Sequence, residues 1–251
     1  MSKRSRSKTR RSTKLSRPSR WLLAILLLPC LWALVHQTGL LAPDLMEEGL
    51  RAWWLYLAGI LTYLAVERVL SRPMWLYVFG HEMTHALTGL LSGAKVHSFK
   101  AKSSGGEVRL SKSNAFIALS PYVIPIYLVG VALIYAMTRH WWNPPQLLPV
   151  FQFMLGLALA FHISLTISAV HRHQPDLKVL GFFLSGVLIL MGNTLVLAFL
   201  GIGLFAKTPT FSTYAKSVGN ETWDGWVKSA GVLQRGIMRG YEYLRRQPWT
   251  R

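Results

Sequence analysis

Two histidines and a glutamate lie together in the segment Gly80-His81-Glu82-Met83-Thr84-His85-Ala86. If this segment is helical, His81 and His85 are one turn apart and project from the same face, where both imidazoles can bind one zinc ion. Glu82 is offset by one position and can act as a general base toward a water on that ion. The pattern therefore predicts a hydrolytic zinc site.

A catalytic zinc ion takes three protein ligands and keeps a fourth position for water, so one ligand must come from elsewhere in the chain. We expect this ligand to be Asp176, the only acidic residue between Glu107 and Glu221. Its neighbour Pro175 interrupts regular helix and can turn the carboxylate inward. An N-cap on the following helix is a second role open to Asp176. The other candidate ligands are four histidines: His97, His162, His171 and His173.

The rest of the sequence is typical of an integral membrane protein. Hydrophobic residues make up 51% of the 251 residues and charged residues only 15%, whereas soluble domains carry about 25% charged residues. The apolar residues form runs of about 20, the length that crosses a bilayer core. Ionisable side chains are costly in such a run, so the histidine and glutamate cluster indicates a functional site. The alternative is a polar cluster that only holds a helix bundle together.

We predict an all-α polytopic membrane protein with about six transmembrane helices and a small membrane-associated β-hairpin. The motif lies in the third apolar segment, and two prolines interrupt the fourth. Between the third and fourth segments, residues 94–113 alternate apolar and polar side chains around Gly105-Gly106, which predicts the hairpin. The six segments are 21–42, 52–70, 74–92, 114–138, 146–170 and 178–206.

Basic tails flank the transmembrane domain, which we expect at 21–206. The formal net charge is +18, and residues 1–20 hold nine Lys or Arg and no acid. We interpret 1–20 as a disordered segment that contacts anionic lipid headgroups, and not as a specific nucleic-acid site, since no aromatic residue precedes Trp21. Within the C-terminal tail, 207–251, residues 222–246 predict a basic amphipathic helix suited to a membrane surface or a partner protein. Nothing in the sequence indicates an oligomeric state.

Six spans would place both tails on one side of the membrane, and their charge predicts that this side is the cytoplasm. The hairpin at 94–113, with five Lys or Arg, would then lie outside, against the same rule. The conflict disappears if an early segment does not span or if the hairpin folds back into the membrane. Because no organelle-type targeting segment is evident, we predict a bacterial inner membrane protein.

Two further polar residues lie inside apolar segments. His162 could bond to a neighbouring helix, or could lie near the zinc ion or the substrate. Asn193 could stabilise a developing oxyanion or hold two helices together.

These residues resemble the site-2 protease-like family of intramembrane zinc metalloproteases. The resemblance covers roughly 74–200 and depends on the Gly80–Ala86 motif, on Ser92-Gly93-Ala94-Lys95-Val96 before the hairpin, and on Pro175-Asp176. It implies that His81, His85 and Asp176 bind Zn²⁺, that Glu82 activates water, and that the substrate is a membrane-embedded protein. In that family a β element beside the site is thought to receive the unwound substrate. This chain departs from the pattern at Leu177, where the family usually has glycine, and it has no room for a PDZ domain.

Two other functions fit parts of the pattern. A non-catalytic scaffold of the same fold would bind transmembrane helices, but it would have no need of a general base such as Glu82. A zinc hydrolase acting on a lipid-linked substrate would have no need of a strand-like hairpin, whereas an extended peptide could pair with one. We therefore favour the peptide substrate, and predict that Val96, Phe99 and Val108 shape the binding edge.

Overall fold

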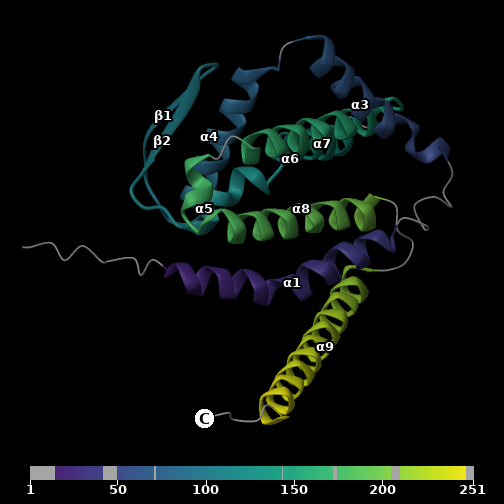
Figure 1. Cartoon of the computed structure of the whole chain (residues 1–251). Helices are drawn as coiled ribbons and strands as arrows, with labels where there is room; N and C mark the ends of the chain where they lie inside the picture. Colours follow the sequence, from purple (N-terminus) through teal and green to yellow (C-terminus); the bar gives the residue numbers. More distant parts are fainter. Residues whose placement is uncertain are drawn as a thin grey trace, which may run out of the picture.

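The structure is a computed structural model that describes residues 15–41, 50–70, 72–142, 144–171, 174–204 and 210–246. Most of this part of the chain is helical, and its two strands form one hairpin (Figure 1). The elements in chain order are α1 (Arg17–Gly39), α3 (Leu50–Val69), α4 (Met74–Leu91), β1 (Val96–Lys102), β2 (Gly105–Leu110), α5 (Ala115–Leu119), the 3₁₀ helix η1 (Ser120–Tyr122), α6 (Ile126–Trp141), α7 (Leu147–His171), the 3₁₀ helix η2 (Pro175–Lys178), α8 (Phe182–Leu204) and α9 (Phe211–Arg246).

Three of the described helices, α1, α7 and α8, are long and apolar enough to cross a membrane. A fourth span exists if α5–η1 and α6, which are bent by 74° at a short break, count as one. All six predicted apolar segments fall on helices, but six spans are not confirmed. The segment with the zinc motif, α4, contains histidines, threonines and a glutamate that lower its hydropathy, and it runs steeply across the direction of α7 and α8 (Figure 1).

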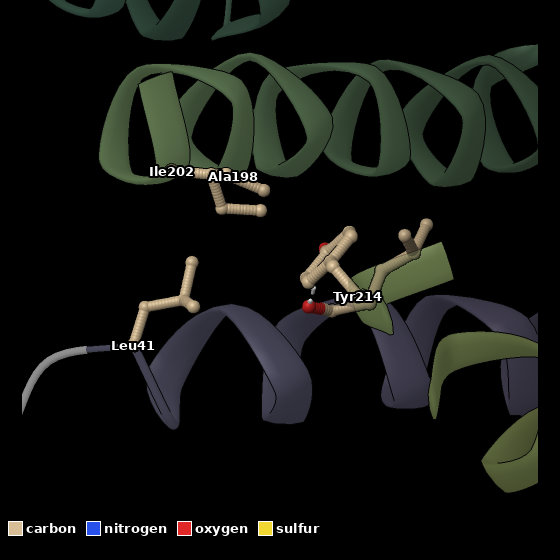
Figure 2. Packing of buried hydrophobic residues seen from close by; sticks show 5 residues of the cluster. Leu41, Ala198, Ile202 and Tyr214 are labelled. Atoms are coloured by element: carbon tan, nitrogen blue, oxygen red, sulfur yellow. Dashed lines mark hydrogen bonds between the residues drawn. The ribbon is translucent and has the colours of Figure 1, made fainter. Parts of the chain in front are cut away.

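Helices α1 and α8 lie side by side and run in the same direction (Figure 1). At their beginnings the Trp21 ring stacks on Phe183, with centroids 4.8 Å apart. At their ends Leu41 packs in one buried cluster with Ile202 and with Tyr214 of α9 (Figure 2). Both helices therefore begin at one end of the bundle, and α9 begins at the other end.

Helices α3 and α7 approach each other closely because two glycines face the contact. A Cβ atom at Gly156 would lie 2.1 Å from the carbonyl oxygen of Tyr56, and one at Gly59 would lie 2.1 Å from that of Phe153. Small residues of this kind allow the van der Waals contact that joins helices in a lipid environment. The pair provides the flank against which α6 also packs.

The predicted β-hairpin is present and lies against α4. The strands β1 and β2 pair antiparallel with Phe99 opposite Val108. The Phe99 ring meets Phe79 of α4 edge to face, at 5.8 Å between centroids. On the same helix, Gly89 leaves room for Leu110 of β2. Phe99 thus helps to hold the hairpin on α4, and its predicted place at a substrate-binding edge stays a prediction.

The fourth apolar segment is broken where its prolines predict. Pro121 lies in the first turn of η1, and Pro125 caps α6. A proline lacks the backbone N–H that a continuous helix would use, so the chain turns sharply here. The Thr88 hydroxyl of α4 and the Ser120 hydroxyl, 2.9 Å apart, join the break to the helix with the motif.

Helix α9 contains the predicted amphipathic stretch at 222–246 but begins at Phe211. It is fixed to the last turns of α1 by Glu221, whose carboxylate accepts a hydrogen bond from Gln37 at 2.8 Å and contacts the His36 ring at 2.9 Å. Beyond this contact its large apolar side chains are exposed: Trp223, Val227, Val232, Leu233, Ile237, Tyr241 and Leu244.

Candidate metal centre

Helix α4 presents its two histidines on one face, as the motif predicts. The rings of His81 and His85 have centroids 4.8 Å apart and are nearly perpendicular, at 86°. The His85 side chain is 10% exposed and that of His81 11%. Both imidazoles are therefore mostly shielded from solvent while remaining next to each other.

The hydrogen bond of His85 fixes the nitrogen that it offers to a metal. Its Nδ1 lies 2.8 Å from the backbone carbonyl of Ile117 in α5. A carbonyl oxygen only accepts, so Nδ1 carries the proton, and the neutral ring keeps its Nε2 lone pair for a metal. The broken segment α5–η1 thus orients a histidine from another helix.

Asp176 lies in η2, just before α8, and faces both histidines. Its Oδ2 is 3.4 Å from Nε2 of His81 and 3.5 Å from Nε2 of His85. The three ligand atoms lie within 4.8 Å of one another. Two ligands on a tetrahedral zinc ion, each about 2.0–2.2 Å from it, are about 3.3–3.5 Å apart. The two distances to Asp176 and the N,N,O donor set therefore fit a zinc ion.

The hydroxyl of Tyr122, at the end of η1, donates a hydrogen bond to Oδ2 of Asp176 at 3.0 Å. Tyr122 is only 1% exposed. Burial alone would raise the pKa of the Asp176 carboxyl, but the adjacent His81 and His85 side chains outweigh it and hold that pKa well below its usual range. The carboxyl is therefore ionised, as a metal ligand must be.

Glu82 lies between the histidines and the hairpin. A Cβ atom at Gly106 of β2 would be 2.5 Å from the Cγ of Glu82, so the strand touches this side chain closely. Val108 of the same strand and Glu82 line one cleft. Among the described strands β2 pairs only with β1, so its other edge is open.

A cleft of about 850 Å³ brings these groups together. It is lined by the three candidate ligands and Glu82, by β2, and by the segment before α8, including Val179. The basic hairpin consequently lies at the end of the bundle where α8 and α1 begin (Figure 1). His97 also lines the cleft, but it is not in the group of described residues whose ligand atoms converge.

His162 and Asn193 are bonded to each other instead of to that group. The Nε2 of His162 lies 3.1 Å from Oδ1 of Asn193, which joins α7 to α8. The amide of Asn193 donates to the carbonyl of Tyr122 at 2.7 Å, behind the tyrosine that holds Asp176. A cavity of about 30 Å³, enough for a water molecule, is lined by both His162 and His81. The predicted helix-to-helix bond of His162 is thus present.

The last two candidate ligands, His171 and His173, are not placed by the structure, and Tyr122 is a site residue that the sequence analysis did not predict. The side chain of His171 and the whole of His173 lie outside the described residues. Tyr122 carries no motif; the only signal for it is its position between Pro121 and Pro125, in a segment that must be irregular.

The peptidase M50B-like family model matches residues 54–215, which is 162 of the 251 residues. The match includes the zinc motif, the hairpin, Tyr122 and Asp176. Comparison with curated proteins gives no significant match, and neither does comparison with solved structures. A family model that covers most of the chain, over a motif with converging histidines and aspartate, confirms the resemblance to site-2 proteases. The chain belongs to the peptidase M50B-like family, a family of site-2 proteases.

Proposed function

We propose that this protein is an intramembrane zinc metalloprotease that cleaves membrane-embedded protein substrates. His81, His85 and Asp176 would bind Zn²⁺, and Glu82 would be the general base. The observation that carries the proposal is the convergence of these three ligand atoms in a cleft that Glu82 and a strand edge also line. Family membership and the apolar helices support the class of enzyme and its place in a membrane.

Each residue has a defined part in peptide hydrolysis. A zinc ion bound here would polarise the scissile carbonyl and lower the pKa of the attacking water. Glu82 would accept the proton that this water loses and deliver it to the leaving amine nitrogen. The hydrogen bond that Nδ1 of His85 donates to the carbonyl of Ile117 keeps this ring in the tautomer that would bind a metal, and Tyr122 keeps the carboxylate of Asp176 directed at the histidines.

The substrate must be extended at the bond that is cut, because a helix uses its carbonyls internally. The open edge of β2 offers backbone groups to such a segment. Since Gly106 and Val108 of this strand line the cleft together with Glu82, a peptide paired along this edge would pass beside the general base. We propose that β2, through Gly106 and Val108, aligns the substrate.

Zinc content and cleavage, measured on the same detergent-purified protein, test this proposal. We expect about one zinc per chain in the wild type and its loss in His81→Ala and Asp176→Ala. Glu82→Gln should keep zinc but lose cleavage of a single-span model peptide by several orders of magnitude. Full biological activity of Glu82→Gln would instead indicate the non-catalytic scaffold. If the wild type, prepared with an excess of zinc, contained no bound zinc, the metalloprotease would be refuted.

We further propose a bacterial inner membrane location, with residues 21–206 as the membrane domain and the basic 1–20 segment in the cytoplasm. The hairpin with its five cations would be on that same side, since it lies where α1 and α8 begin. The predicted cytoplasmic position of the C-terminal tail stays a prediction, and it requires α9 to return from the far end of α8. Labelling with an impermeant maleimide tests whether the two tails are on the same side of the membrane or on opposite sides. The labelled proteins are single-cysteine variants at Ser5 and at Gln234, made in a Cys30→Ala background.

A further inference from the structure

A second cavity, separate from the cleft with the candidate ligands, lies between the beginnings of α1 and α8. Its volume is about 540 Å³. Three cationic side chains line it, two from α1 and one from η2, together with aromatic and aliphatic side chains and no acidic one. The lining residues are Arg17, Arg20, Trp21, Lys178, Leu180, Gly181, Phe182, Phe183 and Leu184.

The three cations are brought together by the fold from positions about 160 residues apart in the sequence. The Nε of Arg20 donates to the carbonyl of Leu15 at 2.8 Å, which orients its guanidinium. Its Nη1 lies over Gly181, where a Cβ atom would be 3.7 Å away. Within the described part of the chain, Arg17, Arg20 and Lys178 form no ion pair with a carboxylate. The cavity therefore holds an uncompensated positive charge.

The position of the cavity relates it to a membrane boundary. Both α1 and α8 are candidate spans, and both begin here. Trp21 and Phe183, whose rings stack at 4.8 Å and 24°, form an aromatic wall. Tryptophan is enriched at the level of the lipid headgroups, and basic pockets between transmembrane helices bind anionic headgroups. Leu180 and Leu184 add an apolar wall toward the bundle.

We propose that this cavity binds the phosphate headgroup of an anionic glycerophospholipid. The two guanidinium groups can each bind phosphate oxygens through paired N–H donors, and Lys178 adds a point charge. The positive end of the α8 dipole adds to this favourable field. The aromatic and aliphatic walls would contact the glycerol and the upper acyl chains, which free phosphate lacks. The bound lipid would tie the start of α1 to η2, the element that carries Asp176.

Native mass spectrometry of the full-length protein in detergent, titrated with phosphatidylglycerol or phosphatidylcholine, tests the proposal. We expect one phosphatidylglycerol to bind at least about tenfold more tightly than phosphatidylcholine. Arg17→Gln and Arg20→Gln should each weaken it by about tenfold, the usual effect of losing a charge-assisted hydrogen bond. A triple variant that includes Lys178→Gln should lose the bound lipid.

A matched control removes three exposed cations from α9, as Arg235→Gln, Arg239→Gln and Arg245→Gln, and should retain the bound lipid. Equal retention by the cavity variant and the wild type would overturn the proposal, as would equal binding of both lipids by the wild type. Displacement of the lipid by millimolar inorganic phosphate would assign the cavity to free phosphate instead. A photoactivatable phosphatidylglycerol bound to the wild type should label peptides within 15–21 and 177–184, and labelling elsewhere only would refute the site without any variant.

Discussion

Replacing Tyr122 with phenylalanine should weaken zinc binding without unfolding the protein. The change deletes one hydroxyl, which donates a hydrogen bond to Asp176 at 3.0 Å. Tyr122 itself is only 1% exposed. Without this bond the carboxylate is free to rotate away from the histidines. Zinc binding must then restore the orientation of the carboxylate, which makes its free energy less favourable.

The magnitude follows from the kind of hydrogen bond that is lost. A hydrogen bond to a charged group contributes about 1.5–3 kcal/mol. At 3.0 Å this one is longer than the 2.5–2.7 Å typical of an O–H···O⁻ bond, so we take the lower value, about 1.5 kcal/mol. The zinc Kd of Tyr122→Phe should therefore rise about tenfold.

The assay is competition for zinc with a chromophoric chelator in detergent, together with peptide cleavage at limiting and at saturating zinc. If Tyr122 acts by positioning Asp176, cleavage falls at limiting zinc and recovers when zinc is saturating. Tyr214→Phe is the matched control, because the hydroxyl of this buried residue also makes a hydrogen bond, with the Thr38 hydroxyl at 2.8 Å, but far from the site. An unchanged zinc Kd in Tyr122→Phe, or an equal rise in Tyr214→Phe, would refute the reasoning.

Three further changes test the contacts around the site and in the bundle. Gly106→Val should displace Glu82, since even a Cβ atom would meet its Cγ at 2.5 Å; we expect about a hundredfold slower cleavage with zinc content unchanged. Gly156→Ala should destabilise the bundle by at least about 1–3 kcal/mol, measured by thermal unfolding in detergent, because the new methyl would lie 2.1 Å from a backbone carbonyl of α3. The hydrogen bond from Gln37, and then that from His36, lowers the pKa of Glu221 below 4.5. The docking of α9 that these bonds stabilise is therefore present above pH 4.5 and is lost as the pH falls through the lowered pKa. Glu221→Gln should remove this pH dependence, measured by hydrogen exchange of the α9 backbone.

Controls for these changes come from the same chain. Gly130→Ala on α6 meets no atom within 4 Å, so it should leave thermal unfolding unchanged, and a loss equal to that of Gly156→Ala would contradict the packing argument. Zinc lost from Gly106→Val would mean that the strand supports the metal ligands and not only Glu82. Undocking of α9 with the same midpoint in Glu221→Gln would place the titrating group elsewhere.

Local patterns in the sequence predicted the elements around the site more fully than the contacts between them. The four-residue spacing of His81 and His85 and the alternation around Gly105-Gly106 are properties of neighbouring residues, and both the helix and the hairpin are present. The prolines of the fourth segment likewise predict its break. The proximity of Asp176 to the histidines was inferred from its isolation among apolar residues, and the structure places it beside them.

Contacts between distant segments left no such local signal. Nothing near Tyr122 in sequence shows that its hydroxyl meets a carboxylate 54 positions later. The steep direction of α4 depends on how the hairpin and η1 pack on it, while its apolar length alone predicts an ordinary span. The contact of Phe99 with the Phe79 ring of α4 likewise had no local signal in the sequence.

The direction of α4 also explains how one chain can combine a water-dependent reaction with a membrane bundle. A helix that crossed the bilayer centre with His81, Glu82 and His85 would bury them in hydrocarbon, where ionisable groups are costly. Here the three lie in a cleft lined by the polar hairpin and by the segment before α8, at one end of the bundle. Water can therefore enter beside β2 without crossing the apolar contacts of α3 with α7 or of α1 with α8. Under the proposed function, a membrane-embedded substrate would have to leave its own helix before it reached Glu82, because the open edge of β2 accommodates an extended chain.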